Sequence, residues 1–575
     1  SSPRHARAEG RAGANEHARV RWIRRARAAG AMPSWLYNAL ALSRFAITEQ
    51  WQLLDRNCWP DFSLHYGVCC SDEIPPDPRC FADGKTRQQC CGCIGANNSA
   101  TAARAAAASA SETGHATVEG PSALGVELSR HFFGPLLCDG PSVKVTRDDF
   151  LVTEDGGARQ RLLRVFVYRL PRKFNGDLLN RLQLGGWSLG SECDYGLTLC
   201  TEEKWNGLFS VYRQFATEVL VLLKFLAAPP GVLTQNPNEA DLFVVPYFAK
   251  TDCAESGNAG ADPCWGKCKC ATAVKHLFAE LRHYNWGTRG RHLFLATGDI
   301  KDLPVEIQAQ PLIVSLGASF CGGHVVVPSP NLDPVLQPGG RFELLEVNGM
   351  APDRHIFAYW FGANDKRWRQ RVLGQLIEYG RRPDARLVVV HDIGCNYAAR
   401  DVWQTEADKP SMVLEEMYRS IFCPILQGDV PHQKRLFDAM LTGCLPVVVA
   451  FPSHVPGKVS WWLPGGPPVE RMLPYAEDVD YRSFVVEVPQ SEVDAGRVVD
   501  ALLRIPDEEI QRRRDAMRLA RPFVRFDFGG SGPDAFSMTV RALWRALKSQ
   551  ADGAERNAAP KFDCGVPPWQ SEGIL

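Results

Sequence analysis

The sequence predicts an α/β protein, and three observations lead to this prediction. Short apolar runs rich in Val, Ile, Leu and Phe recur along residues 161–548, at the lengths of buried strands. Amphipathic stretches with helical spacing separate several of these runs, as in βαβ units. The segment 417–450 shows the alternation most completely, as strand, glycine turn, helix and strand. We therefore expect mainly parallel sheets covered by helices.

Length and charge restrict the class of protein. The 575 residues are enough for several domains with sizeable cores. Basic and acidic residues balance at 65 each, so no excess charge favours nucleic acid as a partner. No run of about 20 apolar residues is present, so the sequence contains no recognisable membrane-spanning helix.

The N-terminal part differs in composition from the remainder. Residues 1–50 form an arm rich in Arg and Ala, which we expect to be disordered or to be a targeting segment. Cysteines concentrate between 58 and 93, so we expect a disulfide-stapled module over residues 51–97, with zinc binding as the competing interpretation. Asn97 begins a glycosylation sequon. Residues 98–160 are predicted to be a low-complexity linker.

Two globular domains are predicted after this linker. The first spans residues 161–335, and the second spans residues 350–548. The stretch 330–350 is rich in Pro and Gly and is interpreted as their connection, and 549–575 as a polar tail. In the first domain the apolar runs predict strands at 163–168, 240–248, 292–296 and 324–327, and a helix at 212–226.

The segment 417–450 organises the second domain. Residues 420–426 suit a buried strand, and Gly428, Asp429 and Pro431 form a turn. A helix is predicted over 433–441, and Gly443 ends it before a second buried strand at 445–450. A βαβ crossover places the turn and the helix start at the carboxyl edge of the sheet, where open α/β sheets bind ligands.

The chemistry at this edge suits a nucleotide diphosphate. Free amides at the helix start favour an anion, and Lys434 and Arg435 add positive charge beside it. One turn further on, the carboxylate of Asp438 can accept hydrogen bonds from ribose hydroxyls. An ordinary crossover with a solvated basic helix start explains the spacing equally well.

The same segment resembles the hallmark of the exostosin family of glycosyltransferases. In that family an S-x-F-C-L run leads to G-D-T-P, then to R-L-F-D-A and S-G-C-I-P-V. The matching residues here are Ser420, Phe422, Cys423, Gly428, Asp429, Pro431, Arg435, Leu436, Phe437, Asp438, Ala439, Gly443, Cys444, Pro446 and Val447. Residues 432–434, H-Q-K, replace the small hydroxyl residues of the family.

Other segments follow in the family's order, so the resemblance covers roughly residues 162–546. The E-A-D-L-F-V-V-P run at 239–246 is similar to the family's E-A-D-L-F-F-V-P, and F-G at 361–362 ends a strand that is similar to the family's F-F-x-G strand. The resemblance implies a GT-B fold, with two Rossmann-like domains facing a cleft. Domain 161–335 would then hold the acceptor and domain 350–548 the nucleotide sugar.

The resemblance also implies inverting transfer of a sugar from a nucleotide donor, UDP-linked, to a glycan or glycoprotein acceptor. It implies no tightly bound cofactor and no metal, and the D-x-D spacing at Asp478 and Asp480 is interpreted as structural. The diphosphate would lie against Gly428, Asp429, Lys434 and Arg435, and the ribose against Asp438. From the basic run 366–371 itself, Arg367 is a candidate to reach a donor phosphate across the cleft; the alternative is that this run is a solvated helix face.

Asp299 is the candidate general base for the acceptor hydroxyl, because it follows the predicted strand 292–296 and inverting transfer needs such a base. The alternative is that this aspartate caps a turn. The family has a histidine before the aspartate, and this chain has Gly298 there. This departure and His324 support a second hypothesis, a non-catalytic glycan-binding or scaffolding protein with a decayed transferase fold.

Further expectations follow from the resemblance. The protein would act in the Golgi lumen, with its type II membrane anchor missing from this chain, and in a complex with another glycosyltransferase. Cys423 and Cys444 would lie on neighbouring strands, either as a disulfide or as two buried thiols, and we favour the thiols.

Overall fold

The computed structural model describes residues 120–555 except 134–142, 155–158, 179–216, 250–251, 253–270, 297–304, 309, 317–323, 331–333, 350–352, 363, 365, 393–409, 429–432, 528 and 531. All described residues belong to one compact unit, which contact clustering separates from residues 1–101. The predicted arm 1–50, the cysteine-rich module 51–97 and Asp299 lie outside the described residues.

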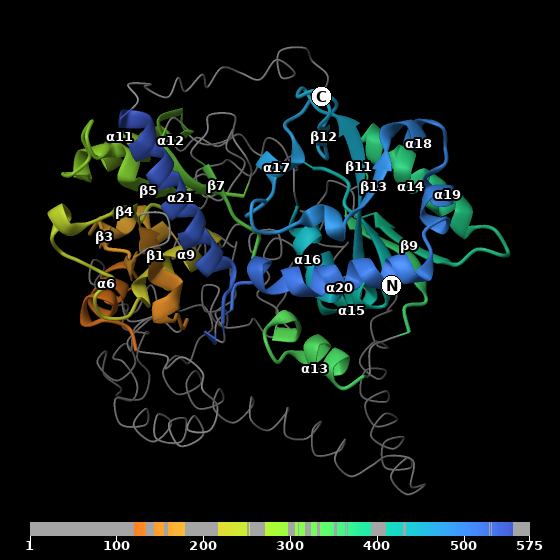
Figure 1. The fold of residues 1–575 in the computed structure, drawn as a ribbon, viewed down its shortest axis with the longest axis horizontal. Coiled ribbons are helices and arrows are strands. Elements are labelled where there is room, and N and C mark those ends of the chain that lie inside the picture. The colour runs from red at the N-terminus through yellow and green to blue at the C-terminus, as the bar shows by residue number, and fades with distance from the viewer. Residues whose placement is uncertain are drawn as a thin grey trace, which may run out of the picture. The chain divides into compact units, whose positions relative to one another are not determined.

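A first sheet is formed by five parallel strands that are adjacent in chain order (Figure 1). They are β3 (Val165–Val167), β4 (Leu242–Val245), β5 (His292–Leu295), β6 (Leu312–Ser315) and β7 (His324–Val326). Every residue of the three central strands is buried, as expected for a parallel sheet that is covered on both faces. The predicted strands at 163–168, 240–248, 292–296 and 324–327 are confirmed, with shorter ends.

Helices and a small hairpin accompany this sheet. The helices are α6 (Ala123–Phe133), α9 (Thr217–Leu226), α11 (Ala271–Glu280) and α12 (Val305–Gln308). The hairpin pairs β1 (Leu151–Glu154) with β2 (Arg159–Leu162) in antiparallel fashion. The prediction of a linker over 98–160 is therefore wrong for residues 120–133 and 143–154. Its apolar residues Leu128, Phe132 and Phe150 are fully buried, so this stretch contributes to the core.

A second sheet is formed by five parallel strands in the order β9–β8–β10–β11–β13, and a short strand pairs in antiparallel fashion with the last residues of β11. They are β8 (Ile356–Gly362), β9 (Leu387–Asp392), β10 (Ser420–Pro424), β11 (Leu445–Pro452) and β13 (Val486–Pro489); the short strand is β12 (Val459–Ser460). After β8, the chain adds β9 on one side of it. It then crosses to the other side of β8 and adds β10, β11 and β13 in that order. The topological switch point therefore lies between β8 and β10.

Helices cover both faces of the second sheet (Figure 1). One face carries α14 (Arg367–Gly380), α18 (Gln490–Asp494) and α19 (Val498–Leu503), and the other carries α15 (Pro410–Tyr418), α16 (Lys434–Thr442) and α20 (Asp507–Val524). A further short helix is α17 (Val469–Met472). The α16 helix ends at Gly443 with φ +80°, as predicted, because a left-handed residue there favours glycine.

The stretch 330–350, predicted to be a connection, contains helix α13 (Arg341–Val347). Its Phe342 stacks on Tyr418 with the ring centroids 4.1 Å apart. Burial of this aromatic pair, together with Leu336, packs residues 334–347 against the rest of the fold despite their Pro and Gly residues.

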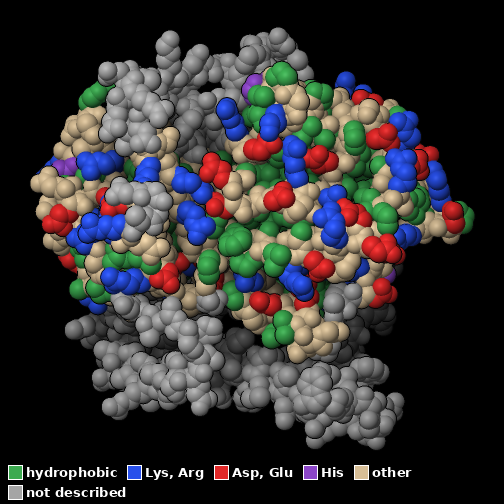
Figure 2. Space-filling view, in the orientation of Figure 1, with side chains coloured by type: hydrophobic (Ala, Val, Ile, Leu, Met, Phe, Trp, Pro, Cys, Tyr) green, Lys and Arg blue, Asp and Glu red, His purple; other side chains and the backbone are tan. Residues whose placement is uncertain are grey.

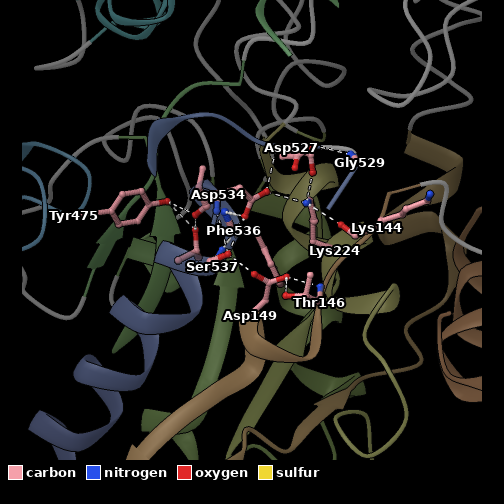
Figure 3. A network of polar contacts seen from close by, with 12 residues as sticks. Lys144, Thr146, Asp149, Lys224, Tyr475, Asp527, Gly529, Asp534, Phe536 and Ser537 are labelled. Carbon is pink, nitrogen blue, oxygen red and sulfur yellow. Dashed lines mark hydrogen bonds and ion pairs between the residues drawn. The ribbon is translucent and has the colours of Figure 1, made fainter. Parts of the chain in front are cut away.

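The C-terminal helix α21 (Ala535–Glu555) packs against elements of the first sheet. Its Trp544 donates a hydrogen bond from Nε1 to the carbonyl oxygen of Thr153, at 3.0 Å. Beside its first turn lies a buried polar network (Figure 3). There Lys224 Nζ donates to Asp534 Oδ2 at 2.8 Å and to the carbonyl oxygens of Lys144 and Asp527. The start of α21 is thus held by an ion pair between residues that are 310 positions apart in the chain.

Acidic and basic side chains are interspersed on the face of the molecule shown in Figure 2, in agreement with the balanced composition. Across the described residues, no helix is long and apolar enough to span a bilayer.

Candidate functional site

The carboxyl edge of the second sheet brings several predicted site residues together. Strand β8 ends at Gly362 and β10 at Pro424. Because the two strands are parallel neighbours, both carboxyl ends lie at the switch point. Helix α16 begins just beyond β10 and places Lys434 and Arg435 in its first turn. This is the position where open α/β sheets bind ligands.

Arg435 is held in a fixed position over the switch point. Its Nη2 donates to the carbonyl oxygen of Phe361, and its Nη1 donates to Gln433 Oε1 at 3.0 Å. The guanidinium carbon lies 3.8 Å from the centre of the Trp360 ring, a cation–π contact. A Cβ on Gly362 would collide with Arg435 Nη2, so the glycine at the end of β8 leaves room for the guanidinium.

Gly428 lies between two side chains at the same edge. A Cβ there would lie 3.0 Å from Arg369 Nη2 and would collide with Gln433 Nε2. Arg369 itself donates from Nε and Nη2 to the carbonyl oxygen of Gln427, at 3.0 and 2.8 Å. The lack of a side chain at Gly428 leaves room for both groups, and the backbone before it is fixed by a buried arginine.

Lys434 and Asp438 form an ion pair along the start of α16. Lys434 Nζ is 2.8 Å from both carboxylate oxygens of Asp438, and Asp438 is 8% exposed. The four-residue spacing places both side chains on one face of the helix. Lys434, which is predicted to bind the diphosphate, thus orients Asp438, which is predicted to bind the ribose.

The arginine of α14 that contacts this edge is Arg369, and the role of Arg367 stays a prediction. Arg367 is exposed at the first residue of α14, whereas Arg369 is buried, with its guanidinium 5.7 Å from the ring centres of Trp360 and Trp368. A signal was available in the sequence: Arg369 precedes Val372 and Leu373 by three and four residues, the spacing of a buried helix face.

Two predicted site residues cannot be located. Asp429 and Asp299 both lie outside the described residues, so their roles stay predictions.

Sequence reasoning missed three polar residues near the carboxyl ends of β8 and β9. His391 Nε2 lies 3.2 Å from Glu416 Oε2, and both side chains are about one third exposed. Burial, followed by the Glu416 carboxylate, raises the pKa of Tyr359 above its usual range. Glu416 and His391 are far apart in the chain, and no local motif links them.

Two buried polar atoms at this edge have no hydrogen-bond partner among the described residues. They are Trp360 Nε1 and Gln427 Oε1, on side chains that are 0% and 5% exposed. Buried polar groups are rarely unpaired, so a bound ligand or water is expected to satisfy them.

The D-x-D spacing has a structural explanation. Asp478 lies 3.0 Å from Arg545 Nη1 and 3.6 Å from Arg541 Nη1. In the described part of the chain, no group of three or more His, Cys, Asp or Glu residues is arranged to hold a metal ion.

The preference for free thiols at Cys423 and Cys444 is wrong. The two residues form a disulfide, with their Cα atoms 5.8 Å apart. The parallel register explains the proximity, because Cys423 lies opposite Pro446 in β10 and β11, and Cys444 immediately precedes β11.

Comparison with known proteins gives a consistent result. A family model described as the Exostosin GT47 domain matches residues 159–503. The chain is 24% identical over 411 residues to a protein of Oryza sativa subsp. japonica named as a probable glucuronosyltransferase, covering 67% of this chain and 80% of the relative. It is 24% identical over 406 residues to a probable β-1,4-xylosyltransferase, IRX10, of Arabidopsis thaliana, covering 67% and 82%. A probable glucuronoxylan glucuronosyltransferase, IRX7, of the same plant is 23% identical over 314 residues, covering 51% and 62%.

Proposed function

This chain belongs to the exostosin GT47 family and is a glycosyltransferase; from that premise we propose that it is an inverting enzyme that transfers a sugar from a UDP-sugar to a glycan or glycoprotein acceptor. Because relatives are named for glucuronosyl and xylosyl transfer, UDP-glucuronic acid and UDP-xylose are the first donors to consider.

One observation carries the donor-site part of the proposal. The guanidinium of Arg435 is fixed at the switch point by Phe361, Gln433 and Trp360, and Gly362 leaves room for it. A fixed guanidinium suits the oxygens of a diphosphate, since its donors match phosphate geometry. Preorganised charge of this kind stabilises a leaving group without reorganisation during the reaction.

The reaction would proceed in one displacement. The acceptor oxygen attacks the anomeric carbon, its proton passes to a general base, and the bond from that carbon to the diphosphate oxygen breaks. The diphosphate leaves with the bonding electron pair, which places negative charge on the oxygens beside Arg435 and Lys434. Asp438, oriented by Lys434, would accept hydrogen bonds from the ribose. Asp299 is the proposed base.

The proposed donor site uses side-chain charge where other transferases use a divalent cation. Arg435, Lys434 and the amides near Gly428 supply positive charge at the diphosphate, so the proposal requires neither a metal nor a tightly bound cofactor.

We also propose a Golgi-lumenal location, a GT-B arrangement with a cleft between domains 161–335 and 350–548, and a complex with another glycosyltransferase. The disulfide between Cys423 and Cys444 supports an oxidising compartment.

Donor binding tests the proposal directly. Purified protein is titrated with nucleotides and UDP-sugars, with and without a divalent cation, beside Arg435→Ala and Asp438→Ala. We expect selective UDP binding that falls about tenfold or more in each variant. Arg504→Ala is the matched control, because Arg504 lies in a surface ion pair with Glu492 and its loss should leave binding unchanged.

The outcomes separate the two hypotheses. UDP binding with slow release of free sugar from the UDP-sugar supports the enzyme. If the folded wild-type protein binds no nucleotide, the donor site is refuted, and glycan binding by a decayed transferase fold becomes the hypothesis to examine.

A further inference from the structure

The second sheet has one edge that the described part of the chain leaves open. Strand β9 pairs with β8 on one side, and no described strand pairs with it on the other. Alternate residues of an edge strand direct their backbone N–H and C=O groups outward, where these groups can bond to a further strand. Within the described ranges, residues 387–391 make no backbone hydrogen bond outside the ladder with β8. The outer edge of β9 is therefore able to accept another strand.

The residues of β9 are those of a strand that is paired on both sides. Leu387, Val388, Val389 and Val390 are apolar, and three of the four are β-branched. Leu387 is 50% exposed, and the three valines are half-buried. Natural edge strands usually carry a lysine or a proline, or are very short, which prevents pairing with other chains. The six residues of β9 include neither lysine nor proline.

The other sheet edges that the described residues form are protected. At the edge of the first sheet, Val165 of β3 donates to the carbonyl oxygen of Val232 at 2.9 Å and accepts from the N–H of Thr234 at 3.0 Å. At the opposite edge, β7 has three residues and contacts α21. In the second sheet, β13 is short, carries Glu487 and ends at Pro489. Strand β9 therefore differs from the other edge strands by lacking such protection.

A second copy of this chain fits the open edge by symmetry. Two β9 strands that are related by a two-fold axis run antiparallel, and residues that lie opposite each other belong to the same face of the joined sheet. The register that pairs the whole apolar run has its axis at Val389. It places Val388 opposite Val390 of the second copy, and Leu387 opposite His391. The valines of the two copies then meet directly, which stabilises an antiparallel pair.

The same register matches charges at both ends of the pairing. Arg386 is exposed beside the Phe357 ring and forms no ion pair in the described part of the chain. With the axis at Val389, it lies opposite Asp392, the last residue of β9. The two-fold axis produces this pair of opposite charges twice. A shift of the register by two residues places Asp384 opposite Asp392, or moves Arg386 beyond the end of the strand, so the charges favour one register.

We propose that two copies of this protein pair through β9 in antiparallel fashion, with the two-fold axis at Val389. The five parallel strands of each copy then form one continuous sheet. Pairing gives partners to the outward backbone groups of β9 and to the charge of Arg386. The proposal does not depend on the proposed function, because the pairing uses none of the residues assigned to donor binding.

Sedimentation velocity of the full chain tests the assembly. Over about 1–100 μM protein, we expect a concentration-dependent shift from monomer to dimer. Arg386→Glu should weaken the dimer about tenfold or more, because two like-charged pairs replace two pairs of opposite charge. Arg386→Glu/Asp392→Arg should restore it. Arg147→Glu is the matched control, because Arg147 is likewise exposed and without an ion pair among the described residues, but it precedes β1.

Single cysteines test the register. In Val389→Cys the two introduced thiols lie opposite each other, with Cα atoms about 4.5–5.5 Å apart, a separation that a disulfide spans. In Val388→Cys they are diagonal neighbours about 7–8 Å apart, which is too far. We therefore expect mild oxidation to cross-link Val389→Cys dimers well above the background of the wild type. Val388→Cys should remain at that background.

Three results would overturn the proposal. The first is a wild-type protein that stays monomeric over the whole concentration range, which would mean that β9 does not pair with itself. The second is a dimer whose affinity is the same in Arg386→Glu as in the wild type, which would place the interface elsewhere. The third is a Val388→Cys protein that cross-links as readily as Val389→Cys, which would contradict the register.

Discussion

At the scale of single residues, the carboxyl edge of the second sheet depends on the geometry of arginine as well as on its charge. Arg435 stacks on Trp360 and also donates to Phe361 and Gln433. Arg369 uses two nitrogens on a single carbonyl oxygen, that of Gln427. Lysine cannot reproduce a planar group that stacks and donates in two directions.

Arg435→Lys therefore separates charge from geometry. We expect UDP affinity to fall by about tenfold, because the ammonium keeps the charge but loses the stacking and the fixed direction. Titration of both proteins with UDP at two ionic strengths provides the measurement. Unchanged affinity at both would show that only the net charge matters at this position.

A second residue, His292, makes stability depend on pH. It is fully buried, stacks on Phe243 with the ring centroids 4.6 Å apart, and lies 2.8 Å from the hydroxyl oxygen of Tyr168. Burial is the main reason that its pKa falls from 6.5 to about 4, and the charge of Arg291 adds to it. In the folded protein the imidazole is therefore neutral near pH 6.

The unfolded chain binds a proton at His292 below pH 6.5, whereas the folded chain does so only near pH 4. The contribution of His292 to the free energy of unfolding is thus fully present above pH 6.5 and is lost as the pH falls towards 4. We expect the free energy of unfolding to decrease by about 2 kcal/mol between pH 7 and pH 5. Urea titrations at several pH values measure this, and His292→Gln should lack that part of the pH dependence.

At the scale of elements, a disulfide joins the two strands on either side of α16, and a glycine cap ends this helix. The Cys423–Cys444 bond closes a loop with a sequence separation of 21, which contains the turn and all of α16. Restricting this loop lowers the conformational entropy of the unfolded chain. The N-terminal turn of the helix, with Lys434 and Arg435, is thereby tied to two neighbouring strands.

Replacing both cysteines should destabilise the fold. We expect Cys423→Ala/Cys444→Ala to lower the free energy of unfolding by about 3 kcal/mol. Urea unfolding without reductant measures the difference, and it should disappear when the wild type is unfolded with reductant. A difference that persists under reducing conditions would indicate a packing defect instead of the lost bond.

At the scale of the whole molecule, the last helix joins distant parts of the chain. Lys224 of α9 is 1% exposed and bonds to Asp534, which also accepts hydrogen bonds from the backbone of Phe536 and Ser537 at the start of α21 (Figure 3). One carboxylate therefore both caps α21 and neutralises a buried lysine.

Lys224→Met should leave that carboxylate buried and unpaired. We expect a loss of about 3–5 kcal/mol in the free energy of unfolding. The double variant Lys224→Met/Asp534→Ser should recover a large part, because serine keeps the cap without the charge. Urea unfolding of both single variants and the double variant gives the coupling, and additive effects would show that the two groups do not interact.

The sequence by itself determined the elements whose signals are local. The buried strand 292–296, the βαβ unit around α16 and its left-handed Gly443 follow from apolar runs, helical spacing and backbone sterics within a few residues. The family hallmark identified Gly428, Arg435 and Asp438, the basic helix start identified Lys434, and the structure places all four at one edge.

Only the tertiary structure decided which distant groups meet. It brought Arg369 to Gln427 across 58 residues, paired Cys423 with Cys444, and returned α21 to the β1–β2 hairpin. The physical reason is that strand order, register and burial depend on the packing of the whole chain, whereas periodicity reports only which face of an element is apolar. A basic helix start can therefore be read from the sequence, but the arginine that becomes buried beside it is decided by packing.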